Sequence, residues 1–365
     1  MKQPRRGTGW NAGLKKRKEA RGMERLPAGL AGKLVAWYRA GHRDLPWRQD
    51  KEPYHVWLSE IMLQQTRVEA VKGYYARFLR ELPTIEALAA CEPDRLQKLW
   101  EGLGYYSRVR NLQKAARIIV NDLGGEFPRT LDEIRILPGV GAYTAGAIAS
   151  ICFELPAPAV DGNVLRVLSR VMADDSCVSK QAVKDRYSAK LAEVYPAGAC
   201  GDFTQSLMEL GATVCLPNGE PRCETCPIAS VCRARADGAQ KRYPVKEAKK
   251  NRRMENLTAF RLLCGEKCAV RKRADAGLLA GLWELPNVPG LLDASGALAL
   301  LETWDLQPRE LVSMREKTHI FTHVAWNMRC FTVVCAREAA GFTWVDGARF
   351  DHDIALPTAF RQFWE

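Results

Sequence analysis

The strongest constraint on the fold is a group of four cysteines that lie close together in the sequence. Cys215, Cys223, Cys226 and Cys232 follow the spacing C-x7-C-x2-C-x5-C. Four thiols at this density in a chain with reduced cysteines indicate a metal site. Zinc modules with four cysteine ligands usually present two C-x2-C pairs, whereas one pair flanked by single cysteines fits a cubane iron–sulfur cluster better. The spacing therefore favours iron–sulfur, with zinc or no metal as the alternatives.

The charge of the chain points to a polyanionic partner. Its 365 residues carry a net charge of +12, and the isoelectric point is about 9.2. A balance this basic favours nucleic acid or an anionic membrane. No apolar run is long enough to span a membrane, and no apolar segment follows the basic N-terminus as in a secretory signal. We therefore expect a cytoplasmic protein in which most of the other eight cysteines are small buried side chains.

The organisation along the chain predicts two domains. Residues 1–22 hold eight Lys or Arg and one Glu without hydrophobic periodicity, so we expect a disordered tail or an over-long gene start. Residues 23–233 form a mainly helical domain, because apolar residues recur at helical spacing. The stretches that show this spacing best are LAGKLVAWY, TIEALAA, DRLQKLWEGL and DFTQSLMELGATV. A basic linker is expected at 234–254, where no core-forming period is present.

After about residue 255 the sequence changes from helical apolar spacing to strand-like composition. LTAFRLLCGEKCAVRKR, MRCFTVVCA and GFTWV have the composition of strands, and ALALLETWDL has that of a helix. We therefore predict a second, α+β domain over residues 255–365.

A glycine-rich loop, LPGVGAYTAGA, lies within the helical domain. Gly139 and Gly141 are preceded by a short helix that the capping box Thr130–Glu133 opens, and a small-residue helix follows them. A dinucleotide-binding loop requires a preceding strand, which is missing here. The pattern instead indicates a helix-hairpin-helix at about 130–150, whose backbone N–H groups suit a DNA phosphate. A plain turn between two helices is the alternative.

Two carboxylates are candidates for chemistry. Glu60 lies among apolar residues in VWLSEIMLQQTRV, and desolvation there would raise its pKa and let it act as a general acid. Asp161, in PAVDGNVLRV, stands at a turn where it could also simply cap a helix. An apolar-shielded Glu and an Asp together suit cleavage of a glycosidic bond through an oxocarbenium-like centre.

Two further stretches suit contact with bases. Gln64-Gln65-Thr66 interrupts the apolar pattern with amides and a hydroxyl that can hydrogen-bond a base edge. Gly102-Leu103-Gly104-Tyr105-Tyr106 can place an apolar or aromatic wedge in a base stack. Ordinary helix-end chemistry is the alternative for both.

Together these pieces resemble the endonuclease III, or helix-hairpin-helix, superfamily of DNA glycosylases. The resemblance rests on LPGVG, an aspartate 20 residues after the second hairpin glycine, and the cysteines after LMELGATVC. HRDLPWR, SEIMLQQTRV and GLGYYSRVRNL narrow it to the adenine DNA glycosylases of the MutY type. That family acts on adenine paired with 8-oxoguanine or guanine, extrudes the base from the duplex and contains a [4Fe–4S] cluster.

The resemblance implies roles for individual residues. Glu60 would protonate the adenine ring, and Asp161 would stabilise the sugar cation with help from Tyr143 and Asn163. The residues around the flipped adenine would be Arg43, Trp47 and Gln205. DNA and the opposite base would be contacted by Arg48, Gln65, Thr66, Leu103, Tyr105, Gly139, Gly141, Thr322 and His323.

Three departures from the family pattern matter. The first cysteine interval has seven intervening residues where the family usually has six. The second domain resembles a Nudix hydrolase domain in GLLAGLWELPN but lacks its run of metal-binding glutamates, so we expect no nucleotide hydrolysis. Thr322 in IFTHVAW stands where the family commonly has Ser, which keeps a hydroxyl for sensing the lesion.

The expected protein is a monomeric, monofunctional glycosylase that acts on duplex DNA with adenine:8-oxoguanine or adenine:guanine mispairs. One alternative is a bifunctional pyrimidine glycosylase/lyase, which carries a lysine beside the hairpin to form a Schiff base; here that position is Tyr143. Another is a non-enzymatic DNA-binding protein that uses the cluster as a redox sensor.

Overall fold

The computed structural model describes residues 25–248 and 251–364, so the basic tail at 1–22 lies outside the described residues. Contacts between residues divide the chain into two compact units. Of the described residues, the first unit, the excision unit, comprises 25–64 and 118–248; the second, the sheet unit, comprises 65–117 and 251–364. No helix of the described ranges is long and apolar enough to cross a membrane.

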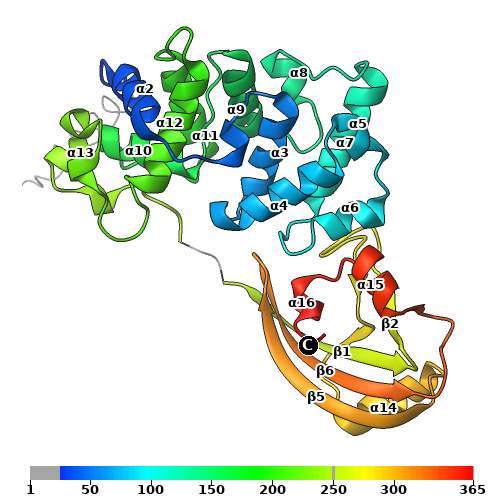
Figure 1. Ribbon diagram of the computed structural model, residues 1–365. Helices are drawn as coiled ribbons and strands as arrows, with labels where there is room; N and C mark the ends of the chain where they lie inside the picture. Colours follow the sequence, from blue (N-terminus) through cyan, green and yellow to red (C-terminus); the bar gives the residue numbers. More distant parts are fainter. Residues whose placement is uncertain (1–24, 249–250, 365) are drawn as a thin grey trace, which may run out of the picture. The chain divides into compact units, whose positions relative to one another are not determined.

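The excision unit is helical, as predicted (Figure 1). Its α-helices are α2 (Leu30–Gly41), α3 (Pro53–Leu63), α8 (Leu131–Arg135), α9 (Ala142–Phe153), α10 (Gly162–Met172), α11 (Gln181–Ala192), α12 (Cys200–Thr213) and α13 (Arg233–Ala236). Short 3-10 turns are η1 (Pro46–Arg48), η2 (Cys223–Thr225), η3 (Ala229–Val231) and η4 (Gln240–Arg242). Helix α7 (Ser107–Asp122) contributes residues to both units.

Helix α12 is central to the core of the excision unit, because it packs against α2, α9 and α10. Phe203, Leu207 and Leu210 follow the spacing of one helix face and are fully buried in a cluster with Leu34 and Leu168. The core thus fixes the ends of α9, α10 and α12 relative to one another.

The predicted helix-hairpin-helix is present as α8, a glycine turn and α9. Thr130 accepts a hydrogen bond from the Glu133 backbone while the Glu133 side chain accepts from the Thr130 backbone, which confirms the capping box. Gly139 has φ 79°, a left-handed conformation that favours glycine. Gly141 then caps the N-terminus of α9, where backbone N–H groups lack intrahelical partners.

The sheet unit combines a helical segment with a sheet. Its helical segment contains α4 (Val68–Glu81), α5 (Ile85–Ala90), α6 (Pro93–Leu99) and most of α7. Residues 251–364 form a seven-stranded mixed sheet of β1 (Arg253–Cys264), β2 (Lys267–Lys272), β3 (Trp283–Glu284), β4 (Asn287–Pro289), β5 (Pro308–Ile320), β6 (Val324–Cys335) and β7 (Thr343–Val345). The central pair β1–β6 is parallel, and β5 pairs antiparallel with β6 along one edge.

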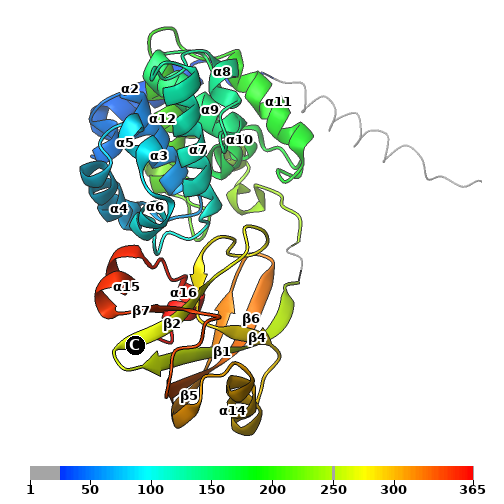
Figure 2. The same ribbon diagram turned by 90° about the vertical axis from the view of Figure 1, so that its right-hand side faces the viewer.

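Helices cover both faces of this sheet (Figure 2). Alternate residues of each strand face opposite sides, so Phe260 packs on one face with α14 (Ala294–Thr303), whereas Ala259 packs on the other. On that other face lie the last helices, α15 (Gly347–Asp353) and α16 (Thr358–Arg361), through Phe350 and Phe360. The α+β class predicted for the C-terminal part is therefore confirmed.

Candidate active site

Glu60 lies on α3 within an unbroken run of seven buried residues, 56–62. Only 7% of Glu60 is exposed. Burial raises the pKa of the Glu60 carboxyl from 4.5 to about 7, and the charge of Asp161 acts in the same direction. The Tyr143 hydroxyl donates a hydrogen bond to Glu60 and Arg48 adds positive charge, and both oppose this rise. A carboxyl with such a pKa is suited to deliver a proton near neutral pH.

Asp161 is both a helix cap and a member of this cluster. Its Oδ1 accepts from the Val164 backbone N–H at 2.7 Å and so caps α10. Its Oδ2 accepts from Asn163 Nδ2 at 2.7 Å. Burial raises the pKa of Asp161, although these hydrogen bonds oppose the rise. The capping interpretation of Asp161 is confirmed, and the charge of its carboxylate reaches Glu60, whose pKa it raises; its part in chemistry stays a prediction.

Asn163 is held in turn by the helices around it. Arg166 donates to Asn163 Oδ1 at 2.9 Å and to the carbonyls of Gly211 and Cys215 at 2.7 and 2.8 Å. A Cβ on Gly211 would come within 2.6 Å of the Asn163 Cβ. Only glycine therefore allows α12 to approach Asn163 this closely.

Tyr143, on the first turn of α9, brings the hairpin into the site. Its hydroxyl is hydrogen-bonded to Glu60 and lies 3.8 Å from the sulfur of Met208. Burial and the nearby charges of Glu60 and Asp161 raise its pKa well above the usual value, so the phenol stays neutral and donates. Close packing fixes α9, because a Cβ on Gly146 would come within 2.2 Å of the Pro158 carbonyl oxygen.

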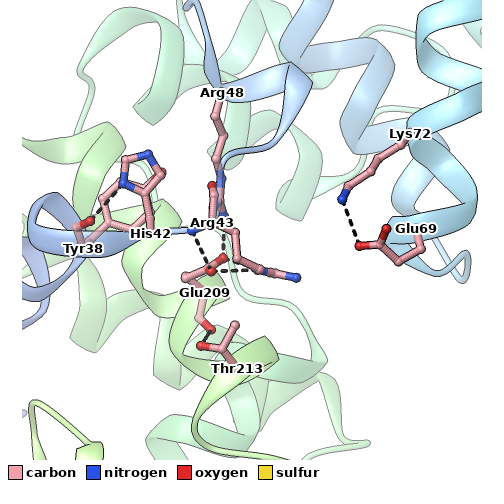
Figure 3. Close-up of polar contacts among 8 residues, drawn as sticks. All are labelled: Tyr38, His42, Arg43, Arg48, Glu69, Lys72, Glu209 and Thr213. Atoms are coloured by element: carbon pink, nitrogen blue, oxygen red, sulfur yellow. Dashed lines mark hydrogen bonds and ion pairs between the residues drawn. The ribbon is translucent and has the colours of Figure 1, made fainter.

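Glu209 is a candidate functional residue that the sequence reasoning missed (Figure 3). Its carboxylate accepts from Arg43 Nε at 2.7 Å, from Arg43 Nη2 at 2.9 Å and from Arg48 Nη2 at 2.8 Å. Burial alone would raise the pKa of Glu209, but the two guanidinium groups outweigh it and lower the pKa to about 2. A carboxylate among apolar neighbours in LMELG was the signal that could have found it, as it found Glu60.

The remaining residues predicted around the adenine, Trp47 and Gln205, lie on η1 and α12. Trp47 is buried on η1, between Arg43 and Arg48 in the chain. Gln205 is half-buried on α12, one turn before Glu209 and on the same helix face. Arg48, predicted to contact DNA, is buried and holds Glu209 and the Arg43 carbonyl; its contact with DNA stays a prediction.

The four clustered cysteines line one cavity of the excision unit together with Arg170 and Gln240. Arg170 Nη1 lies 3.2 Å from Cys215 Sγ and 2.9 Å from the Leu216 carbonyl oxygen. Among the described residues, no group of three or more His, Cys, Asp or Glu side chains is arranged to hold a metal ion. The donor set is nevertheless suited to an iron–sulfur cluster, since four thiolates face one space and a guanidinium can offset their charge.

The residues predicted to meet the opposite base belong to the sheet unit. Gln65 and Tyr105 have positive φ angles of 59° and 47°, uncommon for residues with side chains. Such backbone strain clusters at functional sites. Tyr105 is exposed, whereas Leu103 is packed inside and Thr66 accepts from Arg108 at 3.4 Å.

A cleft of about 630 Å³ lies within the sheet unit beside these residues. It is lined by Gln65, by residues 102–107, by residues 319–324 and by segments around 277–282 and 357–358. The Tyr105 hydroxyl lies 2.8 Å from Thr322 Oγ1 across the cleft, and His323 beside it is exposed. The cleft thus brings together Gln65, the loop at 102–107 and the loop at 319–324, which are far apart in the sequence.

Comparison with known proteins agrees with this geometry. Residues 58–193 match the HhH-GPD superfamily of base excision DNA repair proteins, and residues 258–365 match the NUDIX domain. The chain is 35% identical to the human adenine DNA glycosylase in an alignment 396 positions long, gaps included, which covers 91% of this chain and 72% of the human protein. The chain belongs to the adenine DNA glycosylase family.

Other relatives extend this result. The chain is 32% identical to the adenine DNA glycosylase of Schizosaccharomyces pombe, covering 87% of this chain and 85% of the yeast protein. A solved thermostable thymine-DNA glycosylase matches with a TM-score of 0.51 and 27% identity, over 61% of this chain and 99% of that one. This member of the adenine DNA glycosylase family is therefore an enzyme that hydrolyses N-glycosidic bonds in DNA, rather than a non-enzymatic DNA-binding protein.

Proposed function

We propose that this glycosylase removes adenine that is paired with 8-oxoguanine or guanine, and that it leaves an abasic site without cutting the strand. The observation that carries the chemistry is the buried carboxyl of Glu60, with a pKa of about 7, hydrogen-bonded to Tyr143 and next to Asp161. Cleaving the bond between sugar and adenine requires an acid for the leaving base and a negative charge for the sugar. These two carboxyls have different environments and suit the two roles.

Glu60 delivers its proton to a ring nitrogen of adenine, so the protonated adenine takes up the electrons of the breaking C1′–N9 bond and leaves as a neutral base. The ionised Asp161 stabilises the positive sugar until the oxygen of water bonds to C1′, and the proton that this water loses passes to the Glu60 carboxylate. Asn163 and the Val164 N–H hold Asp161 in place for this role. Tyr143 orients Glu60 with its hydroxyl.

The adenine pocket is formed by Arg43, Trp47 and Gln205, with Glu209 as the group that fixes the arginines. The two oxygens of Glu209 bind Arg43 and Arg48 at the same time. This arrangement fixes the guanidinium of Arg43 before a base arrives, which lowers the cost of ordering it on binding.

Tyr143 supports base excision without strand cleavage. A lyase needs an amine at the sugar to form a Schiff base, and a neutral phenol bound to Glu60 cannot supply one. Borohydride trapping on substrate DNA tests this point. We expect no trapped complex, and efficient trapping through an active-site amine would favour the lyase.

Cys215, Cys223, Cys226 and Cys232 are proposed to hold a [4Fe–4S] cluster. When bound, the cluster supplies a fixed cross-link for residues 215–232 rather than chemistry at the sugar. Arg166 and Arg170 tie this loop to α10 through the Cys215 carbonyl and sulfur. The purified protein should hold about four iron atoms per chain; stoichiometric zinc in a colourless protein would contradict the assignment.

The hairpin and the sheet unit are proposed to hold the duplex. Gly139 and Gly141 present backbone N–H groups to a phosphate, which positions the enzyme without reading sequence. Gln65, Thr66 and the exposed Tyr105 open the stack from a loop that the buried Leu103 anchors, and Thr322 and His323 read the base opposite the adenine. The cleft shared by Tyr105 and Thr322 supports this assignment. The enzyme is proposed to act as a monomer on double-stranded DNA.

The decisive variant is Glu60→Gln, which keeps the shape of the side chain and removes its proton. Single-turnover release of adenine opposite 8-oxoguanine should fall at least about a hundredfold, the usual contribution of a general acid. Glu302→Gln, the same exchange at an exposed position of α14, serves as the control for a single charge change. Base release at the wild-type rate by Glu60→Gln would show that the mechanism is wrong.

A further inference from the structure

Helix α6 ends directly before the loop that carries Leu103 and Tyr105. Its last turn holds a cation, Lys98, and an anion, Glu101, follows two residues after the helix ends; both side chains are largely withdrawn from solvent. Only 13% of the Lys98 side chain and 8% of the Glu101 side chain are exposed. Charged side chains are rarely buried unless they are paired. The partners of these two residues therefore show what the pair does.

Lys98 binds the end of a helix more than 250 residues away in the chain. Its ammonium donates to the Phe350 carbonyl at 3.3 Å and to the Ile354 carbonyl at 3.0 Å, and it pairs with Glu101 at 3.0 Å. Phe350 and Ile354 belong to the last turn and C-cap of α15. The last carbonyls of a helix lack intrahelical partners and favour a positive charge. Lys98 thus serves as the C-terminal cap of α15.

Glu101 binds the segment that follows α15. Its Oε1 accepts from the Leu356 backbone N–H at 2.9 Å, and its Oε2 pairs with Arg361 Nη1 at 2.7 Å. The next residues in each segment, Gly102 and Pro357, both line the cleft. The ion cluster of Lys98, Glu101 and Arg361 therefore lies directly behind the cleft wall.

The loop in front of this cluster has little freedom to adjust. Gly102 has φ 96°, and a Cβ there would come within 2.2 Å of the Tyr74 hydroxyl, which itself donates to the Glu101 carbonyl at 2.8 Å. Farther along, Arg110 donates to the Ala280 carbonyl at 2.8 Å. The loop that carries Tyr105 would therefore follow any shift of α6 relative to the C-terminal helices as a rigid body, and Tyr105 would move relative to Thr322.

We propose that the ion cluster of Lys98, Glu101 and Arg361 sets the register between the Tyr105 loop and the Thr322 loop, and so determines how well the enzyme distinguishes 8-oxoguanine from guanine opposite the adenine. Lys98 and Glu101 are positioning residues in this account, since neither meets the DNA base. The inference rests on the proposed function, because it assigns a role in reading the opposite base.

The test uses Lys98→Met in the full-length holoenzyme. This variant leaves Glu101 paired with Arg361 and Leu356, so no charge is orphaned. Single-turnover adenine release is measured opposite 8-oxoguanine and opposite guanine. We expect the ratio of the two rates to fall about tenfold, the effect of losing one well-placed hydrogen bond, while release opposite guanine stays within about twofold of the wild type. The matched control is Lys72→Met. It removes an exposed lysine whose Nζ pairs with Oε1 of Glu69 on the same helix at 3.0 Å (Figure 3).

Hydrogen exchange of backbone amides gives a second readout, which a change in the chemical step alone would leave unaltered. Peptides covering 100–106 and 319–324 should exchange faster in Lys98→Met, and the hairpin at 137–147 should not. Glu101→Gln keeps an acceptor for the Leu356 N–H and should lose less of the rate ratio than Glu101→Ala. An unchanged ratio in folded Lys98→Met, or an equal loss on both duplexes, overturns the inference. Equal release opposite both bases by the wild type also overturns the inference but leaves the proposed function standing, whereas no adenine release opposite either base refutes the proposed function itself.

Discussion

The buried carboxyl of Glu60 predicts a trade between activity and stability. Replacing Glu60 by Gln should slow adenine release at least about a hundredfold, yet it should make the fold more stable than the wild type in alkaline solution. The reason is that the folded protein holds Glu60 protonated, whereas the unfolded chain releases that proton at a much lower pH.

The magnitude follows from the pKa values. The pKa of Glu60 is raised from 4.5 to about 7 in the folded protein. Because the folded pKa is the higher one, the stabilising contribution is fully present below about pH 4.5 and is lost as the pH rises to about 7. The difference between the two values corresponds to about 3 kcal/mol in the free energy of unfolding. Glu60→Gln has no titrating carboxyl at this position, so its free energy of unfolding does not fall by this amount as the pH rises.

The assay is urea denaturation of the wild type and Glu60→Gln at a series of pH values between 4.5 and 8.5. Other titrating groups are the same in both proteins, so the difference between the two free energies isolates Glu60. Relative to the variant, the wild type should lose up to about 3 kcal/mol across this range. Adenine release by the wild type should fall above about pH 7 as Glu60 ionises. Parallel stability curves for the two proteins would refute the assignment of a buried, protonated Glu60.

Three further predictions concern the groups around it. Gly211→Ala should push Asn163 away, because the new Cβ would come within 2.6 Å of it; single-turnover release should fall by about a hundredfold, while Gly73→Ala, which meets nothing within 4 Å, should not slow it. Tyr143→Phe removes a hydrogen bond that lowers the pKa of Glu60, so the falling limb of the pH–rate profile should move to higher pH by about one unit; a midpoint that stays or moves down would contradict this. Replacing the clustered cysteines by serine should remove the iron and weaken duplex binding, measured by iron content and by DNA titration at fixed salt; unchanged affinity in the iron-free protein would contradict a structural cluster.

Much of the helical part of the fold could be predicted from the sequence, because its helices have strong local signals. The box Thr130–Glu133, the apolar spacing of DFTQSLMELGATV and the glycine turn at Gly139 each act through nearby residues, and each is present in the structure. The strands β1, β2, β6 and β7 were likewise visible as β-branched and aromatic runs.

Strand β5 could not be found in the same way. It is a 13-residue edge strand with mostly exposed side chains, and a register shift between Leu311 and Ser313 breaks its alternation. Its existence depends on pairing with β6, which no local pattern reveals.

The site shows the same division between local and distant causes. Glu60 could be found because its apolar neighbours are adjacent in the sequence. The pairing of Glu209 with Arg43 joins residues 166 apart, and the contact of Lys98 with α15 joins residues more than 250 apart. Such contacts arise only when helices pack, so the sequence alone could not reveal them.

The most direct test of the whole account is base release from a panel of duplexes that each contain one mispair. We expect release of adenine opposite 8-oxoguanine and opposite guanine, with the strand intact until the abasic site is cleaved by alkali. Release of a pyrimidine together with strand cleavage, or no release of adenine from either mispair, would contradict it.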